Sequence, residues 1–484
     1  MSNPPSIHRP PAVNQKRSEF SIIAPASINQ NDKEIITPHQ EDPNYYEKSR
    51  RNSEDLYDNE KAASSASIEE EQIEHVPEGT ASPGKALFML LKAFVGTGVI
   101  FLPGSFVSGG LVFSICLMVF IASICLVAFQ ILVKSQQAIG GSYGDVAKAL
   151  YGNWLRYIIQ FFLCLSQMGF VASYLIFISE NIGLVANTLS NCSSPLEAKY
   201  YIWIVLVAII PITWVRKIAK LSYLAIIADT FILFGLVCVV YYTSSEIAQK
   251  GPGPNIHMIN SSDFALMIGT AVFSFEGIGM VVPIVEGMKE PQKFSRVLNM
   301  GMVICTIIFI FIGTIGYVAY GENTQASVVA NLPKEPLSVT VQILYSVAMI
   351  LTSPFMLYPP LTIIERGIFG THKSGRVSLR YKWLKNLTRS CIPIVCAAVS
   401  FGVGSGGLDK FVALVGSIAC MPLCFIFPGM FHYKVTKSKR AKIFDVILVI
   451  WGFGLLIYTM YININSWIHP SSGGAASATE CVPL

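Results

Sequence analysis

The sequence predicts an all-α membrane protein with about eleven transmembrane helices, arranged as two structural repeats and one extra helix. Hydrophobic residues make up 52% of the 484 residues and charged residues only 13%, whereas a soluble domain carries about 25% charge. From Lys85 onward, apolar runs long enough to cross a hydrocarbon core of ~30 Å recur along the chain. Two of these runs are interrupted by a Gly-x-Gly sequence followed by a proline, at matching places in the two predicted repeats.

The apolar segments define the predicted transporter domain, residues 85–466. The fourth segment is short and the ninth contains Pro393, so the number of helices is approximate. Repeat one would cover about 85–243, repeat two about 263–430, and the extra helix about 443–466. The eleven segments are 85–107, 110–133, 156–187, 200–214, 220–243, 263–287, 297–320, 338–364, 390–405, 408–430 and 443–466.

The first 84 residues differ from the rest in composition. They are rich in Ser, Asn, Glu and Pro, contain the acidic run Glu69-Glu70-Glu71, and show no apolar periodicity. Such a segment cannot bury enough apolar surface to offset its conformational entropy. We therefore predict a disordered cytosolic tail over residues 1–84.

The distribution of Lys and Arg predicts the orientation of the helices. Basic residues concentrate in the loops after the even-numbered segments, above all in 365–390 and 431–442. Cytosolic loops carry this excess in membrane proteins, so the N-terminus is predicted to be cytosolic and residues 467–484 to form a short lumenal tail. Asn191 and Asn260 begin glycosylation sequons in loops of the lumenal side. The loops of that side contain only Lys199, Lys250, Lys334 and Lys410.

The two glycine-containing interruptions predict helices that are broken in mid-membrane. The first reads Gly96-Thr97-Gly98 with Pro103 after it, and the second reads Gly277-Ile278-Gly279 with Pro283 after it. A break frees backbone N–H and C=O groups, which can bind the carboxylate and the ammonium of a zwitterion. Paired breaks in two repeats indicate the substrate site of a secondary transporter. The alternative is that the glycines only permit close packing of helices.

These interruptions also resemble the motifs of a known family. The sequence from Leu91 to Pro103, with Lys-Ala-Phe-Val-Gly-Thr-Gly at its centre, resembles the first-helix motif of the amino acid/auxin permease family. Phe275-Glu276-Gly277-Ile278-Gly279 resembles the sixth helix of its proton-coupled branch. The residue sequence of the first motif and the long polar tail are most similar to those of fungal vacuolar amino acid transporters. The resemblance implies that helices 1–5 and 6–10 are inverted repeats, with helix 11 outside them.

Two carboxyl groups within the apolar segments are candidates for proton coupling, because ionisable groups in mid-membrane are costly and usually functional. Glu276 lies in the second interruption. It could carry a proton, receive the substrate ammonium, or cap the free N–H groups of the second half-helix. Asp229 lies near the middle of the fifth segment and could carry a proton or form an ion pair with Lys92. None of the seven histidines falls within a predicted segment.

The remaining candidates for substrate binding come from the interruptions and from the third segment. Gln167 and Tyr174 are seven residues apart, so they share one helix face. Thr352, Ser353 and Tyr358 flank Pro354 in the eighth segment and could complete the site. Each of these could instead make an ordinary hydrogen bond between helices. The predicted substrate-binding residues are Gly96, Thr97, Gly98, Gln167, Tyr174, Phe273, Ser274, Phe275 and Gly277.

The leading functional hypothesis is a proton-coupled carrier that releases neutral amino acids from the vacuole to the cytosol. The alternatives are an amino acid sensor that signals through its N-terminal tail, and an uptake permease of the plasma membrane. The sequence has no phosphate-binding loop, metal-ligand cluster or nucleophile-base arrangement, so it predicts no enzyme, no cofactor and no metal. The net charge of +5 reflects membrane orientation, not binding to nucleic acid. The expected partners are neutral amino acids, protons and the lipid bilayer.

Overall fold

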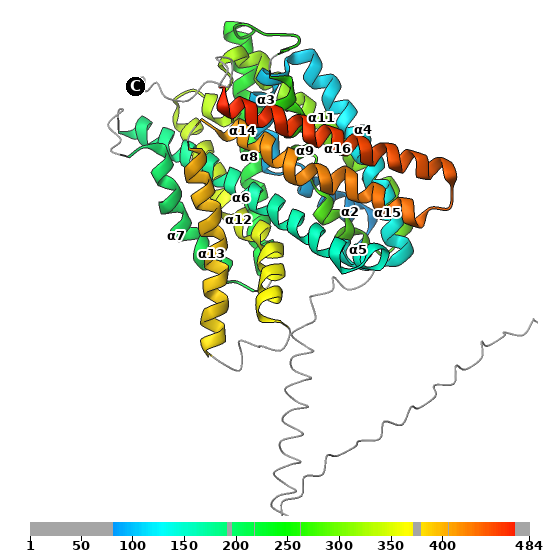
Figure 1. Ribbon diagram of the computed structural model, residues 1–484. Helices are drawn as coiled ribbons and strands as arrows, with labels where there is room; N and C mark the ends of the chain where they lie inside the picture. Colours follow the sequence, from blue (N-terminus) through cyan, green and yellow to red (C-terminus); the bar gives the residue numbers. More distant parts are fainter. Residues whose placement is uncertain are drawn as a thin grey trace, which may run out of the picture. The chain divides into compact units, whose positions relative to one another are not determined.

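The computed structural model describes residues 81–190, 196–216, 218–261, 263–370, 379–404 and 406–469. Nearly all of the predicted N-terminal tail, most of the predicted lumenal tail, and Asn191 lie outside the described residues. The fold is built almost entirely of α-helices (Figure 1).

The first predicted repeat corresponds to α2 through α8. Its first span is interrupted: α2 ends at Phe94, a 3₁₀ turn covers Thr97–Phe101, and α3 begins at Leu102. The helices are α2 (Pro83–Phe94), α3 (Leu102–Gly109), α4 (Leu111–Ile139), α5 (Tyr143–Tyr151), α6 (Asn153–Leu189), α7 (Tyr201–Thr213) and α8 (Ile218–Lys250).

The second predicted repeat corresponds to α9 through α15, and α16 follows it. Its first span is interrupted between α9 and α10, and its last contains two π-helical turns, Gly416–Cys420 and Pro422–Ile426. The helices are α9 (Phe264–Ser274), α10 (Ile278–Glu286), α11 (Phe294–Tyr320), α12 (Pro336–Phe369), α13 (Leu379–Val403), α14 (Leu408–Val415), α15 (Phe427–Val435) and α16 (Lys439–Ile468).

The predicted membrane spans correspond to helices of the structure. Among the described residues, nine helical spans are long and apolar enough to cross a membrane, and the bent pair of α2 and α3 can form a tenth. A shorter apolar helix, Ala198–Thr213, covers the remaining predicted segment. The prediction of an all-α, multi-span membrane protein is therefore confirmed.

Several helices differ from the predicted segments at their ends. α13 begins at Leu379, eleven residues before the predicted segment, because its first turns are basic and have no hydropathy signal. α8 continues to Lys250 and α15 to Val435.

The short helix α5 has no counterpart among the predicted segments. It starts with a capping box in which Ser142 and Asp145 satisfy each other's backbone N–H groups.

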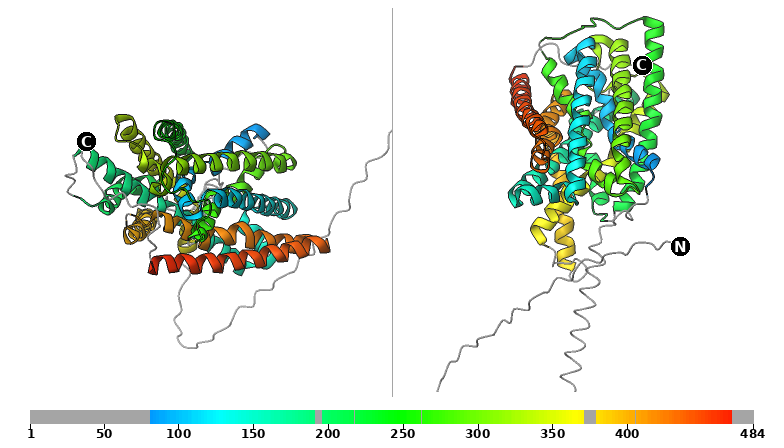
Figure 2. Two further views of the ribbon diagram at one scale, coloured as in Figure 1. Left: turned by 90° about the horizontal axis from the view of Figure 1, so that it is seen from above. Right: turned by 90° about the vertical axis from the view of Figure 1, so that its right-hand side faces the viewer.

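The packing brings the two interrupted spans together at the centre of the fold. α3 packs against α9 and α11, and α10 packs against α2 and α4. The span from Phe264 to Glu286 and the span from Leu408 to Val435 are the most deeply buried, because 89% of the residues in the apolar 18-residue window of each are buried. α16 lies outside this core and packs along α15 (Figure 2). The two interruptions are therefore enclosed by protein.

The ends of α2 and α10 that lie farthest from the interruptions are joined by backbone hydrogen bonds. The N–H of Ala81 donates to the carbonyl of Gly287 over 3.0 Å, and the N–H of Lys289 donates to the carbonyl of Ala81 over 3.0 Å. Ala81 precedes α2 directly, and Gly287 to Lys289 follow α10 directly. These bonds fix the start of the first span to the end of the second half of the sixth.

Candidate substrate site at two broken helices

The first break begins where α2 loses its regular hydrogen bonding. Val95 donates its N–H to the carbonyl of Leu91, and Gly96 then has φ −90° and ψ −137°, outside the helical region. Pro103 lies in the first turn of α3, a position at which a missing N–H costs nothing. The chain therefore leaves the helix at Gly96 and is helical again from Leu102.

The second break lies between Ser274 and Ile278. The N–H of Glu276 donates to the carbonyl of Phe273, and Gly277 has φ −150° and ψ 10°. No described backbone carbonyl accepts from the N–H of Gly277, Ile278 or Gly279. These donors at the start of α10, together with its positive dipole end, are suited to binding a carboxylate.

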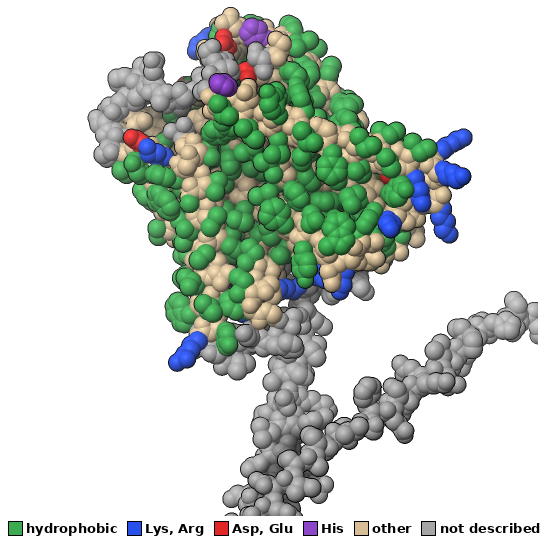
Figure 3. Space-filling model, viewed as in Figure 1, with side chains coloured by type: hydrophobic (Ala, Val, Ile, Leu, Met, Phe, Trp, Pro, Cys, Tyr) green, Lys and Arg blue, Asp and Glu red, His purple; other side chains and the backbone are tan. Residues whose placement is uncertain are grey.

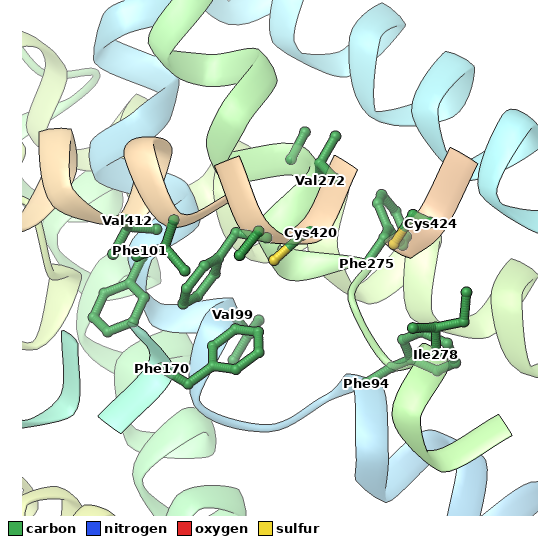
Figure 4. Close-up of a cluster of buried hydrophobic side chains, with 14 of the residues drawn as sticks. Phe94, Val99, Phe101, Phe170, Val272, Phe275, Ile278, Val412, Cys420 and Cys424 are labelled. Atoms are coloured by element: carbon green, nitrogen blue, oxygen red, sulfur yellow. The ribbon is translucent and has the colours of Figure 1, made fainter. Parts of the chain in front are cut away.

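The two breaks face each other at short range. A Cβ on Gly98 would lie 3.6 Å from the Cα of Ser274 and 3.9 Å from the ring of Phe273. A Cβ on Gly277 would lie 2.6 Å from the ring of Phe94. Figure 4 shows the unwound segments on the two sides of this region, with Phe94 next to Ile278 at the start of α10. The structure thus brings the glycines of both motifs to one place.

Aromatic side chains fill the space between the breaks. The ring centroids of Phe170 and Phe273 are 4.4 Å apart, and Phe101 lies 6.4 Å from Phe273. These three residues come from α6, α9 and the 3₁₀ turn, and each is at most 7% exposed. Phe275 packs instead on Phe309, with ring centroids 5.2 Å apart. Phe273 therefore faces the first break, whereas Phe275 faces α11.

Glu276 is a buried carboxyl group in the second break. The residue is 8% exposed, and its Oε1 atom has no hydrogen-bond partner within the described part of the chain. Its electrostatic neighbours are Tyr143, Cys420 and Cys424. Its side chain makes no hydrogen bond with the first N–H groups of α10. The capping role considered from the sequence is therefore not seen among the described residues.

Asp229 forms the ion pair that the sequence allowed. Its Oδ2 lies 2.7 Å from Nζ of Lys92, and the two side chains are 33% and 26% exposed. The pair joins α2 to α8. The predicted pairing is confirmed. The carboxylate of Asp229 therefore balances the positive charge of Lys92, which precedes the first break.

The other candidate residues lie at varying distances from the breaks. Gln167 and Tyr174 are on α6, where Tyr174 is 2% exposed and Gln167 is half-buried. Ser274 is buried and donates to the carbonyl of Thr270 over 2.9 Å. The side chain of Thr97 lies outside the described residues. Gly96 has room around it, because a Cβ there would meet only the carbonyl of Lys92, at 4.0 Å.

The polar residues of the eighth segment are already engaged within the fold. Thr352 and Ser353 donate to the carbonyls of Ala348 and Met349 in their own helix, over 2.8 and 2.7 Å. The hydroxyl of Tyr358 donates to the carbonyl of Arg216 over 3.4 Å. The alternative of a hydrogen bond between segments therefore fits Tyr358, whereas Thr352 and Ser353 bond within α12.

Two observations concern residues outside the breaks. Nδ2 of Asn260, the atom to which a glycan would attach, donates to the carbonyl of Val107 over 3.2 Å, and glycosylation at this residue stays a prediction. His432 lies in the last turn of α15, beyond the predicted segment, and its Nδ1 is 2.9 Å from Oδ2 of the buried Asp445 on α16. The expectation that no histidine lies in a span is thus wrong at this helix end, because α15 is longer than hydropathy indicated.

Comparison with known proteins identifies the family. Residues 79–465 match the family model described as "Transmembrane amino acid transporter protein". The chain belongs to this family. It is a family of transporters, so the sequence-based exclusion of enzymes holds.

The curated relatives include vacuolar transporters of two fungi. The chain is 35% identical over 418 residues to vacuolar amino acid transporter 4 of Saccharomyces cerevisiae, with 80% of this chain and 58% of the relative covered. It is 36% identical over 386 residues to vacuolar amino acid transporter 3 of Schizosaccharomyces pombe, with the same coverage. The chain thus spans less than two thirds of the length of these relatives. The resemblance to fungal vacuolar amino acid transporters is confirmed.

The fold has a counterpart among solved structures. The inward-facing conformation of Mhp1 matches with a TM-score of 0.53 and 17% identity, over 83% of this chain and 94% of that chain. At this identity the match concerns the fold alone. The predicted architecture, with two inverted repeats whose first helices are broken, is consistent with this match and with the packing of α3 and α10.

Proposed function

We propose that this protein is a secondary active carrier that moves neutral amino acids across the vacuolar membrane, from the vacuole to the cytosol, with protons. The observation that carries the proposal is the second break. There a buried carboxyl group with an unpartnered oxygen lies next to three backbone N–H donors that no described carbonyl uses. The names of the fungal relatives support the substrate class and the membrane.

The backbone of the breaks is suited to the charged ends of an amino acid. The N–H groups of Gly277, Ile278 and Gly279 would bind the substrate carboxylate, and the room beside Gly96 would let the ligand approach the first break closely. The chain of the two breaks, residues 94–102 and 274–278, carries no Asp, Glu, Lys, Arg or His other than Glu276. A neutral side chain on the substrate therefore suits the site.

The aromatic cluster of Phe101, Phe170 and Phe273 would respond to substrate. These rings occupy the space between the breaks, so a bound side chain must displace them or pack against them. An apolar substrate side chain would replace ring-to-ring contacts at little cost, whereas a charged one would lose its hydration. This supports a preference for neutral, apolar amino acids.

Reconstitution tests the proposal directly. Purified protein in liposomes would be given a labelled neutral amino acid, such as leucine, with and without an imposed pH difference across the membrane. The expected result is accumulation of leucine on the side to which protons flow, with little transport of lysine or glutamate. Accumulation driven by a sodium gradient alone, or equal transport of charged amino acids, would contradict the coupling or the selectivity.

The proposed orientation has the N-terminus in the cytosol and the C-terminus in the lumen, because basic residues concentrate in the loops of one side. A protease added to intact vacuoles should remove an N-terminal tag and spare a C-terminal tag. The opposite pattern would reverse the assignment.

The alternative functions are separated by two further measurements. A carrier should still transport after deletion of residues 1–80, whereas a sensor should lose its signal with this tail. Localisation of a tagged protein distinguishes a vacuolar carrier from a permease of the plasma membrane. Transport that depends wholly on the tail would favour the sensor.

A further inference from the structure

A basic turn and an apolar groove meet where α15 and α16 are connected. The turn, residues 434–442, carries Lys434, Lys437, Lys439, Arg440 and Lys442. Figure 3 shows Lys and Arg side chains gathered at the right-hand tip of the molecule. In Figure 1 this is the place where α15 ends and α16 begins. Within the described residues, none of the five forms an ion pair with a carboxylate. Their charge is therefore available to a partner.

The groove lies directly beside this turn. It has a volume of about 290 Å³ and continues into a second hollow of about 180 Å³ between α15 and α16. Tyr433 and Val446 line both hollows, so the two adjoin, and together they are called the groove. The lining of the larger hollow is Tyr433, Lys442, Ile443, Val446 and Ile447.

The apolar part of the groove lies on a membrane-spanning helix. Ile447 and Ile450 of α16 are 58% and 66% exposed, and α16 is among the candidate spans. Such exposed side chains at this depth contact lipid tails. The groove therefore runs from the charged end of the helix pair into the apolar region.

Two lysines are held at the mouth of the groove by aromatic rings. Nζ of Lys442 lies 5.2 Å from the ring centroid of Tyr433, and Nζ of Lys434 lies 5.3 Å from that of Tyr151. The hydroxyl of Tyr151 donates to the carbonyl of Met430 over 2.8 Å, which fixes this ring against α15. Lys442 thus lines the larger hollow, and Lys434 lies against Tyr151, which lines the smaller one; neither lysine is paired with a carboxylate among the described residues.

The one carboxyl group in the groove is already paired. Asp445 is fully buried, and both of its oxygens lie 2.9 Å from Nδ1 of His432. The two lysines beside the groove outnumber this single buried carboxyl group. The entrance has a net positive charge, and the walls are apolar.

We propose that this groove binds an anionic phospholipid, with its phosphate headgroup between Lys434 and Lys442 and one acyl chain along Val446 and Ile447. The combination of an unpaired basic entrance with apolar walls on a membrane-spanning helix matches both parts of such a lipid. A soluble anion would use only the entrance. The acidic run Glu69-Glu70-Glu71 of the same chain would use only the entrance too, because it has no apolar periodicity to fill the groove.

Binding of a labelled lipid to the full-length protein tests this proposal. The purified protein would be mixed with fluorescent phosphatidylserine or phosphatidylcholine in detergent, and the affinities compared. Phosphatidylserine should bind at least fivefold more tightly. Because each basic residue near an anionic headgroup contributes about a fivefold change in affinity, the double variant Lys434→Gln/Lys442→Gln should bind the two lipids equally. Lys382→Gln, an exposed lysine on α13, is the matched control and should leave the preference unchanged.

Two further variants separate the lipid from other occupants. Val446→Trp fills the groove and keeps every lysine, so it should weaken phosphatidylserine binding while the protein remains monodisperse. Deletion of residues 1–80 should change the affinity less than twofold. Equal binding of the two lipids by the unaltered protein, or an unchanged affinity in Val446→Trp, would overturn the proposal. Competition by glycerophosphoserine as strong as that by the lipid would assign the site to a soluble anion. A large gain in affinity for phosphatidylserine on deletion of residues 1–80 would assign the site to the N-terminal tail.

Discussion

The two breaks have the same glycine and proline pattern, but their surroundings are unequal. In the first break, a Cβ on Gly96 or Gly98 would meet only ordinary contacts, the nearest at 4.0 and 3.6 Å. In the second, a Cβ on Gly277 would lie 2.6 Å from the ring of Phe94, whereas a Cβ on Gly279 would meet nothing within 4 Å. Gly277 is thus required for packing, Gly98 would accept a Cβ at ordinary contact distance, and Gly96 and Gly279 have free space beside their backbone.

The breaks also differ in charge. Glu276 directly precedes the first glycine of the second motif, and the residue at the same place in the first motif is Val95. Repeats with similar backbones therefore provide one neutral and one ionisable break. The comparison suggests a division of roles, in which the first break admits the substrate backbone and the second adds the carboxyl group.

The largest expected effect comes from removing the ionisable group. Glu276→Gln keeps the shape of the side chain but cannot release a proton, so accumulation driven by a pH gradient should fall at least tenfold. Exchange of labelled for unlabelled amino acid should persist if the carboxyl carries only the proton. Liposome transport measures both, and Glu290→Gln, an exposed carboxyl beyond α10, is the control. Loss of exchange as well would show that Glu276 holds the substrate ammonium.

The second effect concerns the tightly packed glycine. Gly277→Ala should lower the free energy of unfolding by about 1–3 kcal/mol, because the added methyl group overlaps the ring of Phe94. Thermal unfolding in detergent measures this change. Gly279→Ala, with nothing within 4 Å of the new Cβ, should unfold like the unaltered protein. Equal stability of the two variants would remove the distinction between these glycines.

The third effect concerns the first break. In Gly98→Ala the new methyl group makes only ordinary contacts, the nearest at 3.6 Å, so the fold should remain intact. Substrate affinity should nevertheless fall about tenfold, since the methyl group occupies space that the ligand backbone needs, a loss of ~1.4 kcal/mol. Binding and unfolding would be measured on the same preparation. Unchanged affinity would leave the first break as a packing feature.

The smallest effect is expected from the ion pair beside the first break. Lys92 and Asp229 are each about a third exposed or less, and such pairs contribute roughly 0–1 kcal/mol. Asp229→Asn should therefore retain gradient-driven accumulation within a few-fold. If accumulation is lost in Asp229→Asn and kept in Glu276→Gln, the proton carrier is Asp229, and the charge difference between the breaks is not the coupling device.

The spans and the position of the breaks could be predicted from the sequence because both depend on local signals. Long apolar runs mark the helices, and Gly96, Gly98, Gly277 and Gly279 mark the interruptions. The ends of α13 and α15 were missed, since basic turns outside the apolar region carry no hydropathy signal. The π-helical turns between Gly416 and Ile426 have no sequence signature that separates them from an ordinary helix.

The interior of the site was less predictable, because it depends on contacts between distant segments. The glycines look alike in sequence, and only the position of Phe94 separates Gly277 from Gly279. Phe170 was not among the predicted residues, yet it packs closely on Phe273. A run of apolar residues on α6 gives no signal for the one ring that faces the break. The pair of Lys92 and Asp229 was predictable, since two opposite charges in apolar segments have few other partners.

The attachment of α2 to α10 has a mechanical consequence. The N–H of Ala81 donates to Gly287 and the carbonyl of Ala81 accepts from Lys289, which joins the outer ends of these half-helices. The contact of Phe94 with Gly277 joins their inner ends. Because they are joined at both ends, the two half-helices form one rigid body. A displacement of α2 therefore displaces α10 as well. We expect spin labels placed midway along α2 and α10 to keep a constant separation during transport. A force applied to the chain at Ala81 would therefore reach both breaks at once.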